Sequence, residues 1–428
     1  SFGSSANNHL IGELAGLIVA TARWPALLQW GASLDGLHPL WEREVLAQFA
    51  EDGGNKEQAL NYHLFSFEFC LYARQALLTS GRKVSDDANT RLDAAMRFFN
   101  DVQVDREPWD YGDSDNAFVT PLFAGPHFVR EWLYWMAKLN SPALNYWLDA
   151  PPIIGKPPNS GAPLRAEECD DWWLYSESGI AVCESGFWWL RWDLSPLGYL
   201  ATAAHGHLDA LHLSLWWKGV AIVVDPGTGA YYGNKRLRQW LASRGTHNAP
   251  RPNNRLEWPE RLGPFLWAEH HGKPDVERSF EQLQAAVDLD GVRVTRSIKQ
   301  TFHPAGWIVS DSCANAETGF SVRWQFAPGA RFKHISDRQF ELRRDGIAIK
   351  INVSGDWAGV FLAEQKGDEV EQSLLTSAAT GDLERDYAGT VSPAFKKTEW
   401  APYLKLIARP QPGQPCVFTT TFVASDAS

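Results

Sequence analysis

The chain has 428 residues, of which 44% are hydrophobic and 21% charged, and a formal net charge of −11. This length is enough for about two or three domains. No apolar run of about 18 residues is present, so no membrane-spanning helix is predicted, and residues 1–5 have neither the basic start nor the apolar core of a signal peptide. The negative charge argues against a nucleic-acid-binding protein. The five cysteines form no CxxC pair, so neither a thiolate metal site nor a disulfide framework is predicted.

The first part of the chain has the pattern of helices. Apolar residues recur at helical spacing over 10–18, after the cap candidates Ser5 and Asn7. Comparable patterns predict further helices at 41–49, 60–78, 88–99 and 128–139. Residues 151–161 are rich in proline and glycine and are predicted to be an interdomain linker. We therefore place a helical domain at 1–155 and a second domain at 165–428.

After residue 170 the pattern changes to short strands. Residues 179–183 and 187–192 flank a Glu184-Ser185-Gly186 turn, and residues 211–217 and 220–224 flank Lys218-Gly219, which predicts two hairpins. Strand-like segments continue to residue 423. Helices followed by strands, without alternation, predict an α+β fold with segregated domains.

Tryptophan is unusually frequent, with 21 residues. Three doublets lie in strand-like runs: Trp172-Trp173, Trp188-Trp189 and Trp216-Trp217. Because successive strand residues point to opposite faces, one ring of each doublet should pack in the core while the other faces outward or toward a second sheet. An outward ring could stack on a sugar, although core packing is favoured for most.

The His205-Gly206-His207 segment, Asp225 and His247 offer a metal site. On an extended strand, His205 and His207 would project from the same face because they are two residues apart. Two imidazoles and a carboxylate suit zinc, with a water possible in the fourth position, and a structural ion is favoured over a catalytic one. If Lys218-Gly219 is a two-residue turn, however, Asp225 would lie opposite His212, which leaves a His212–Asp225 pair as an alternative.

Several motifs occur in a characteristic order along the chain. They are residues 7–17, residues 52–58, Asn61-Tyr62-His63, residues 112–115 and residues 205–248. This set resembles the heparinase II/III-like polysaccharide lyases, a superfamily that includes heparin/heparan, alginate and other uronan lyases. The resemblance covers most of the chain and weakens after about residue 260. It implies an incomplete (α/α) toroid followed by an antiparallel β-sandwich. Only about half a dozen helices precede the linker, so we expect a further helical segment upstream.

Uronan lyases cleave by β-elimination, which requires neutralisation of the uronate carboxylate, a base for the C5 proton and an acid for the leaving oxygen. Asn8 suits the first role, since its amide donates at a helix N-terminus that favours anions. The resemblance implies that Tyr62 and His205 serve as base and acid. His9 could assist, and Glu13, one turn later, could fix its tautomer. We expect the amide, phenol and imidazole to converge around one sugar ring.

The resemblance assigns the second histidine of the pair to a metal, so His207, Asp225 and His247 are expected to hold a zinc ion that braces the β-domain loops. Tyr231 and Tyr232 are further candidates, since some alginate-cleaving relatives place a base tyrosine in this loop. A polyanionic substrate would also need a local basic patch. Residues 235–255 either provide that patch or form a solvated loop, and the patch would comprise Lys235, Arg236, Arg238, Arg244, Arg251 and Arg255.

The leading prediction is a lyase whose partner is an anionic polysaccharide, with no nucleic acid and no membrane, acting in the periplasm or outside the cell. A glycoside hydrolase using Asp110, Asp113, Asp115 or Glu13 as paired carboxylates is the enzymatic alternative. A non-catalytic carbohydrate-binding protein is the third.

Overall fold

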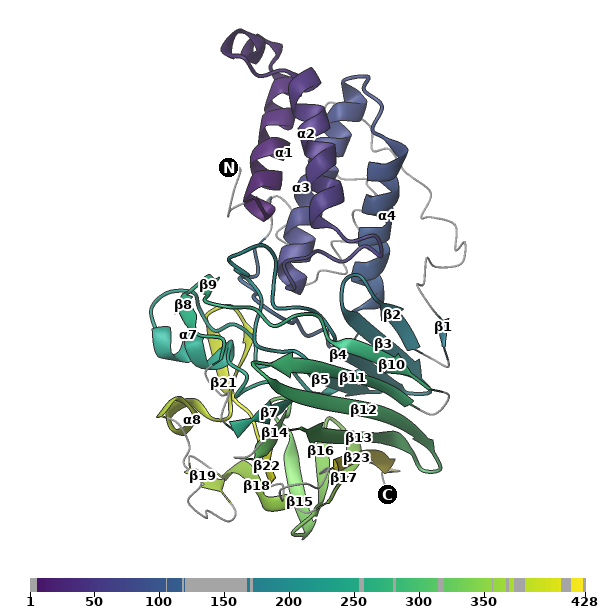
Figure 1. The fold of residues 1–428 in the computed structure, drawn as a ribbon, viewed down its shortest axis with the longest axis vertical. Coiled ribbons are helices and arrows are strands. Elements are labelled where there is room, and N and C mark those ends of the chain that lie inside the picture. The colour runs from purple at the N-terminus through teal and green to yellow at the C-terminus, as the bar shows by residue number, and fades with distance from the viewer. Residues whose placement is uncertain are drawn as a thin grey trace.

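The computed structural model describes residues 6–104, 106–117, 119, 168–169, 172–253, 258–279, 282–314, 319–355, 357–366, 369–372, 382–408 and 417–425. Helices from the first part of the chain stand on a stack of antiparallel sheets (Figure 1). The expected α+β organisation, with helices first and strands second, is confirmed. The helix expected at 128–139 and the linker at 151–161 lie outside the described residues.

The four other expected helices are present. They are α1 (Asn8–Arg23), α2 (Leu34–Gln48), α3 (Leu60–Thr79) and α4 (Asp86–Asp101), with a short 3₁₀ helix η1 (Pro25–Trp30) after α1. Asn7 caps α1, because its side chain accepts a hydrogen bond from the backbone N–H of His9 at 3.3 Å. Leu14, Val45, Leu64 and other buried side chains of these helices form a single hydrophobic core.

A six-stranded antiparallel sheet lies directly beneath the helices, with its strands in chain order. Its strands are β1 (Glu168–Cys169), β2 (Trp172–Tyr175), β3 (Ile180–Ser185), β4 (Trp188–Asp193), β5 (Leu213–Trp217) and β6 (Val220–Val223). Alternate residues of β3 point to opposite faces: Val182 packs with the helices, whereas Ala181 and Cys183 pack with the sheets below. The sheet is therefore covered on both faces, and both predicted hairpins are present.

Two further sheets form the β-sandwich. The eight-stranded sheet contains β10 (Asp275–Arg278), β11 (Gln282–Leu289), β12 (Val292–Phe302), β13 (Ala305–Cys313), β23 (Val417–Ser425), β17 (Ile347–Ser354), β16 (Gln339–Arg344) and β15 (Arg331–Ser336). The five-stranded sheet contains β19 (Glu369–Gln372), β18 (Trp357–Lys366), β22 (Tyr403–Ala408), β14 (Phe320–Gln325) and β7 (Pro250–Pro252). Aromatic contacts join the two: Trp324 meets Phe422 edge-on, with 5.0 Å between ring centroids.

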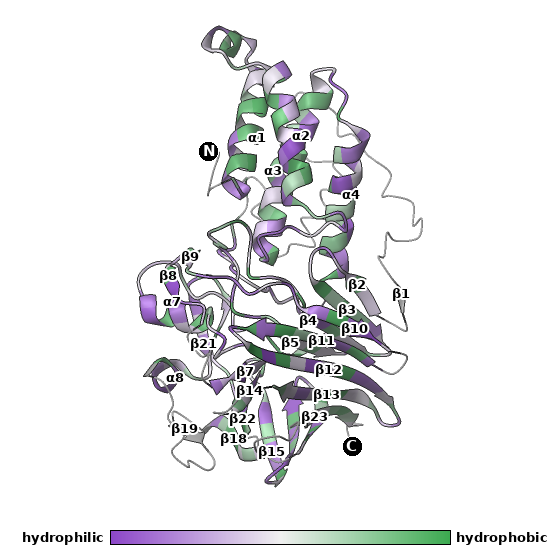
Figure 2. Ribbon diagram, viewed as in Figure 1, coloured by the Kyte–Doolittle hydropathy of each residue, from purple (hydrophilic) through white to green (hydrophobic). Residues whose placement is uncertain are grey.

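The remaining elements lie at the edge of this stack. They are α7 (Lys235–Leu241), α8 (Asp382–Tyr387), and the hairpins β8 (Arg261–Gly263) with β9 (Leu266–Trp267) and β20 (Thr390–Ala394) with β21 (Lys397–Trp400). Figure 2 shows apolar residues along much of α1 and polar residues on α7. In the described residues no helix is long and apolar enough to cross a membrane.

All three Trp doublets alternate as the strand pattern predicts. Trp172 packs toward the sandwich and Trp173 toward the helices. Trp188 and Trp216 are almost completely buried, while their partners Trp189 and Trp217 pack at the borders of the cores. Each of the six rings thus packs against a hydrophobic core. Core packing therefore explains the positions of these rings, and stacking on a sugar is not needed to explain them.

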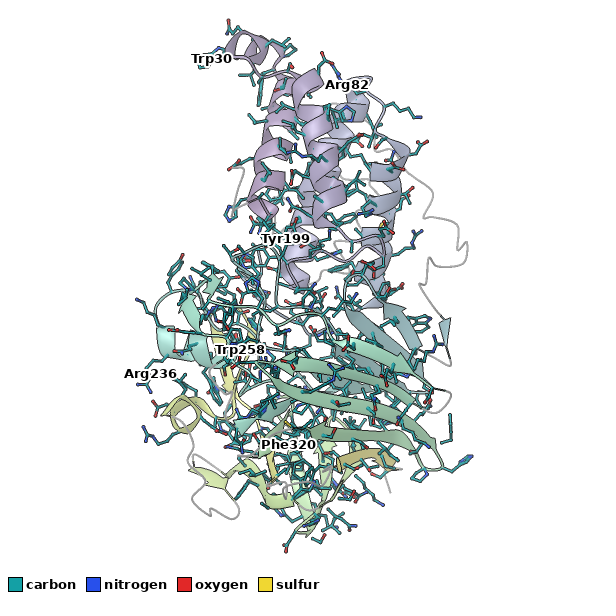
Figure 3. The ribbon with its side chains drawn as sticks, viewed as in Figure 1. Trp30, Arg82, Tyr199, Arg236, Trp258 and Phe320 are labelled. Atoms are coloured by element: carbon teal, nitrogen blue, oxygen red, sulfur yellow. The ribbon has the colours of Figure 1, made fainter. Side chains whose placement is uncertain are left out.

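The segment after α4 runs down onto the six-stranded sheet and ties the helices to it. The Arg191 guanidinium in β4 donates to the carbonyl oxygens of Val102 at 3.2 Å and Trp109 at 2.7 Å. Tyr199, labelled at the junction in Figure 3, donates through its hydroxyl to the carbonyl oxygen of Ala47 at 3.4 Å. These contacts bring the loop at 109–117 between the helices and the loops of the β-domain.

Candidate active site and metal centre

Asn8 is buried at the start of α1 and faces the carboxylate of Glu57, which lies in the loop before α3. Its backbone N–H donates to Glu57 Oε1 at 2.8 Å, and its amide Nδ2 lies 3.0 Å from Oε1 and 2.8 Å from Oε2. The helix N-terminus therefore does bind an anion, as its dipole favours, and in this structure that anion is Glu57. Because Glu57 can only accept, the amide orientation is fixed with Nδ2 toward it.

Tyr62, in the first turn of α3, meets His205 of the β-domain. Their rings are stacked, with 3.5 Å between centroids and 13° between planes. The Tyr62 hydroxyl is 2.9 Å from that of Tyr231 and donates to Asp115 Oδ2 at 3.4 Å. His205 Nε2 lies 3.5 Å from Glu57 Oε2, which links this group to Asn8. The amide, the phenol and the imidazole expected to converge are thus brought together from both parts of the chain.

The surroundings of the two tyrosines favour their neutral forms. Burial, followed by the negative charges of Asp115, Asp113 and Glu57, raises the pKa of Tyr62 far above its usual value, although the hydrogen bond from Tyr231 opposes this. Burial and the charge of Asp113 raise the pKa of Tyr231 in the same way. A tyrosine base needs cationic or donor neighbours to stabilise its phenolate, but apart from the Tyr231 hydroxyl the charged groups near Tyr62 are carboxylates. This arrangement suits a proton donor better than a phenolate.

Asp113 connects this group to the second histidine. Its carboxylate is fully buried, with Oδ2 3.3 Å from His205 Nδ1 and Oδ1 2.8 Å from His207 Nε2. Arg238 in α7 donates to Oδ2 at 2.6 Å. Burial raises the pKa of the Asp113 carboxyl, but the charge of Arg238 and the bonds from both histidines outweigh it, so the net pKa lies well below its usual range.

A close backbone approach places Asp113 there. Gly112 has a positive φ of 64°, and a Cβ at this position would lie 2.3 Å from the carbonyl oxygen of Gln58. Only glycine allows the loop to pass so close to the start of α3. The backbone N–H of Asp113 also donates to the carbonyl oxygen of His205 at 3.1 Å, so the two loops are joined through their main chains as well.

His207, Asp225 and His247 form a buried group whose candidate ligand atoms lie within 4.8 Å of one another. Three buried atoms in this group have no hydrogen-bond partner: His207 Nδ1, Asp225 Oδ2 and His247 Nε2. The other polar atom of each residue is engaged, with Asp113 for His207, the Gly227 N–H for Asp225 and the Ser243 carbonyl for His247. Each side chain therefore directs one free lone pair inward, the arrangement that a divalent metal ion requires.

Burial also shapes the charges of this group. It lowers the pKa of His207 to about 4 and, together with the proximity of His207, lowers that of His247 well below its usual range. Burial raises the pKa of Asp225 to about 7. A metal ion binds imidazoles in their neutral form, so His207 and His247 are in the protonation state that a metal ligand needs, beside the buried carboxyl group of Asp225.

The loops that carry these ligands are locked by Asn248, which is fully buried. Its backbone N–H donates to His212 Nδ1 at 3.0 Å, its amide nitrogen donates to the Val224 carbonyl at 2.8 Å, and its amide oxygen accepts from the Gln325 N–H at 2.6 Å. His212 is thereby used in holding the backbone. Its Nε2 is 4.0 Å from Asp225 and bonds Ser214 Oγ at 3.0 Å instead, so the alternative His212–Asp225 pair is not formed as a hydrogen bond.

One local expectation was wrong, and one alternative pairing is not realised. His205 and His207 lie in a loop between β4 and β5, not on a strand. Their side chains still reach one carboxylate, because Asp113 lies between them. The two-residue turn at Lys218-Gly219 does form, but the pairing shifts by one residue at Leu215, so β5 and β6 do not continue in the register that would place Asp225 opposite His212.

A comparison with protein families matches residues 170–405, more than half of the chain, to the family described as heparinase II/III-like, C-terminal. The chain belongs to the heparinase II/III-like family. The resemblance inferred from the sequence motifs is confirmed. No curated protein matches the sequence.

Solved structures show the same fold. The heparinase III-BT4657 gene product matches with a TM-score of 0.70 at 16% identity, over 99% of this chain and 60% of that one. A crystal structure of heparinase III matches with a TM-score of 0.70 at 14% identity, over 99% and 62%. The heparan sulfate lyase HepC from Pedobacter heparinus matches with a TM-score of 0.64 at 16% identity, over 100% and 61%. This member of the heparinase II/III-like family thus spans about 60% of the length of these structures.

The other predicted site residues lie apart from the cluster or at its edge. His9 and Glu13 occupy exposed positions of α1. Tyr231 is part of the cluster through its bond to Tyr62, whereas Tyr232 is 72% exposed. Arg244 is completely buried, near the charges of Asp209 and Arg251, and its three guanidinium nitrogens have no hydrogen-bond partner.

The predicted basic patch does not form as a whole at the surface, although Lys235 and Arg236 are exposed. Arg238, Arg244 and Arg251 are all buried. Arg238 neutralises Asp113, and Arg251 lies 3.5 Å from Glu384 in an internal ion cluster. Arg236 is exposed and pairs with Asp386 at 2.6 Å. Arg255 lies outside the described residues. Arg238 and Arg251 serve the interior, and together with Arg236 each has an acidic partner distant in sequence.

Sequence reasoning underestimated three residues. Glu57 was only one position of the motif at 52–58, Asp113 was one of several candidate hydrolase carboxylates, and Arg238 was counted in the basic patch. The structure places all three within hydrogen-bonding distance of the proposed catalytic or metal-binding side chains: Glu57 with Asn8, Asp113 with His207, and Arg238 with His207. The Gly112-Asp113 dipeptide was the available signal, because a glycine beside an acid marks a close backbone approach.

Proposed function

We propose that this chain carries the active site of a polysaccharide lyase that cleaves a uronic-acid-containing glycan by β-elimination. The observation that carries the proposal is the convergence of Asn8 and Tyr62 from the helices with His205 from the β-domain. The similar structures are described as heparinase III and heparan sulfate lyase, which makes a heparan-type glycosaminoglycan the first substrate to test.

In the proposed reaction His205 Nε2 takes the proton from C5 of the uronate. The electron pair of that C–H bond forms the C4–C5 double bond, and the C4–O bond breaks. Tyr62 donates its hydroxyl proton to the departing oxygen, which becomes the new hydroxyl of the shortened chain. The raised pKa of Tyr62 supports this division of roles, since the phenol is held protonated. Tyr231, bonded to Tyr62, is positioned to stabilise the phenolate that results.

Asn8 supplies the donor for the substrate carboxylate. Its amide nitrogen carries two hydrogens, and contact with Glu57 occupies that group from one side. The remaining N–H is available to the uronate, where it would stabilise the negative charge that develops as the C5 proton leaves. Phe65, Phe265 and Phe395 pack around Tyr62 and Tyr231 and provide apolar surface for the sugar ring.

We further propose that His207, Asp225 and His247 hold one zinc ion with a structural role. Two imidazoles and one carboxylate are ligands that zinc prefers, and the ion would compensate the buried charge of Asp225 and fix the loops bearing His205 and Tyr231. The four described helices would belong to an incomplete (α/α) toroid. A periplasmic or secreted location fits an extracellular glycan.

The test is incubation of the purified protein with heparan sulfate, heparin, chondroitin sulfate, hyaluronan and alginate. Elimination creates an unsaturated uronate that absorbs in the ultraviolet, and new reducing ends should appear in equal number. Reducing ends without that absorbance would indicate a glycoside hydrolase, and binding without either product would indicate a carbohydrate-binding protein. Either result would overturn the lyase assignment.

A further inference from the structure

A single buried carboxylate contacts both functional histidines. Asp113 Oδ1 is 2.8 Å from His207 Nε2, and Oδ2 is 3.3 Å from His205 Nδ1. The three side chains have 0%, 0% and 6% of their surface exposed, so water does not readily replace either contact. His205 belongs to the proposed proton-transfer site and His207 to the metal group, so Asp113 lies where these two sites meet.

These contacts determine which nitrogen of each ring carries the proton. An ionised carboxylate only accepts hydrogen bonds, so the nitrogens that face it must be N–H groups. His207 Nε2 also lies 3.3 Å from Arg238 NH1, which can only donate, but Asp113 Oδ1 is nearer, at 2.8 Å. In neutral His207 we therefore place the proton on Nε2, and Nδ1 keeps a lone pair toward Asp225 and His247.

His205 lies between two carboxylates, with Asp113 Oδ2 3.3 Å from Nδ1 and Glu57 Oε2 3.5 Å from Nε2. Glu57 Oε2 already accepts from the Asn8 amide at 2.8 Å, so in neutral His205 we place the proton on Nδ1, toward the nearer carboxylate, and Nε2 keeps a lone pair on the side of Tyr62. Both lone pairs are needed, one for the metal and one for proton abstraction.

Arg238 keeps Asp113 ionised and in place. Its NH2 group is 2.6 Å from Oδ2, its side chain is 3% exposed, and it lies on α7, which follows the loop containing Tyr231. A buried carboxylate without such a partner would tend to take up a proton and become a donor. It could not then accept from both histidines.

We propose that Asp113 is a positioning residue that sets the tautomers of His205 and His207 together, and so couples metal binding to proton transfer. The proposal rests on the lyase function for its kinetic consequence, whereas the tautomers can be observed without any substrate. Because the same carboxylate serves both rings, a change that releases His207 also alters the partner of His205.

The first experiment records long-range ¹H–¹⁵N correlation spectra of the protein labelled at histidine, loaded with zinc and free of substrate. His205→Gln and His207→Gln variants identify the two rings. We expect a proton on Nδ1 of His205 and on Nε2 of His207. A proton on Nε2 of His205 in the wild type would overturn the proposal, and this result needs no Asp113 variant to fold.

The second experiment uses Asp113→Asn, which keeps the shape but turns one acceptor oxygen into a donor. One histidine must lose its acceptor, so we expect His205 to change tautomer or the metal content to fall. We expect kcat to fall by about 10³-fold with KM changed less than about threefold, as for a misoriented imidazole. Asp115→Asn is the matched spectral control, since it removes a carboxylate of the same loop that bonds Tyr62 and neither histidine. In Asp115→Asn the tautomers of His205 and His207 should be the same as in the wild type.

The outcomes separate the two proposals. A wild-type protein that cleaves no uronan but shows the expected tautomers refutes the lyase function and leaves Asp113 as the tautomer-setting residue. An active wild type whose Asp113→Asn variant retains both tautomers, full metal content and full kcat refutes the inference about Asp113.

Discussion

The Tyr62 and His205 rings lie face to face, 3.5 Å apart between centroids, although they come from the helices and from the β-domain. Contact at this distance means that the position of each ring depends on the other. The hydroxyl of Tyr62 projects beyond the stack to Tyr231 and Asp115. Removing only the hydroxyl should therefore separate chemistry from packing.

Tyr62→Phe keeps the ring and its stack on His205 but has no proton to donate. We expect kcat on the preferred uronan to fall by about 10²- to 10⁴-fold, the usual contribution of a positioned acid, while the free energy of unfolding changes by less than about 1.5 kcal/mol. The check is the initial rate of ultraviolet absorbance together with urea unfolding. Tyr387→Phe, which removes an exposed hydroxyl bonded to Asn234, is the control and should keep full activity. A fully active Tyr62→Phe protein would show that another group supplies the proton.

Asn8→Ala removes the amide at the start of α1 while keeping the backbone N–H that bonds Glu57. We expect kcat/KM to fall by about 10²- to 10³-fold, as when one donor to a developing anion is lost. Asn100→Ala, at an exposed position of α4, is the matched control. If the two variants cleave the uronan at the same rate, the amide of Asn8 does not act on the substrate.

Local sequence patterns were enough to predict the fold. The site could be predicted only in part, because it depends on contacts between residues that are distant in sequence. Helices α1 to α4 and both hairpins follow from periodicity and turn residues within about 20 positions, whereas the short helices η1, α7 and α8 were not predicted. The metal group followed from the motif order, and the structure brings the same three side chains together. Asp113, however, meets His205 and His207 across more than 90 positions of sequence. No local period encodes such a contact.

The arginines of residues 235–255 show the same limit in another way. Their sequence suggests a basic surface, yet burial depends on which acids the fold brings near them. Glu384 reaches Arg251 from 133 positions away. Asp113 reaches Arg238 from 125 positions away. A group of basic residues close together in a sequence predicts a basic surface only where the fold brings no acidic residues to them.

Metal binding should stabilise the loops that hold His207, Asp225 and His247. The purified protein is expected to contain about one divalent ion per chain, and His247→Ala should lose it and melt at a lower temperature, because a ligand bound only to the folded state raises its stability. Chelation should lower the Tm of the wild type toward that of His247→Ala and leave the variant unchanged. His270→Ala, at an exposed position, is the control. Equal metal content in His247→Ala and wild type would contradict the assigned site.

Arg296 on β12 supports the site from the sandwich. It forms a buried two-pronged pair with Asp311, at 2.7 and 2.9 Å, and donates to the carbonyl oxygens of Leu211 and Asn248. Arg296→Met leaves Asp311 buried without its cation, so we expect a loss of about 3–5 kcal/mol in the free energy of unfolding. Arg293→Met on the same strand breaks only an exposed pair with Asp275 and should cost less than about 1 kcal/mol. Urea unfolding of both variants measures the difference, and equal losses would mean that Arg296 is no more important than a surface arginine.

His63 should make the protein sensitive to mild acid. It is fully buried in α3, its Nδ1 accepts from the Asn55 N–H at 3.1 Å, and its Nε2 donates to the Ala95 carbonyl at 3.0 Å. Burial lowers its pKa from 6.5 to about 3. Between these values the unfolded chain binds a proton that the folded chain does not, so this contribution to stability is complete above pH 6.5 and is lost as the pH falls toward 3.

The variant His63→Gln removes this titration. Below about pH 6 the free energy of unfolding of the wild type should fall more steeply than that of the variant, by about 1.4 kcal/mol per pH unit for one proton. Leu64→Ala, a neighbouring buried position on α3 without a titrating group, is the control for simple destabilisation and should lower the curve without changing its slope. Urea unfolding at several pH values between 7.5 and 5 provides the measurement. Parallel curves for wild type and His63→Gln would mean that His63 is already protonated in the folded protein, or that it stays neutral in the unfolded one.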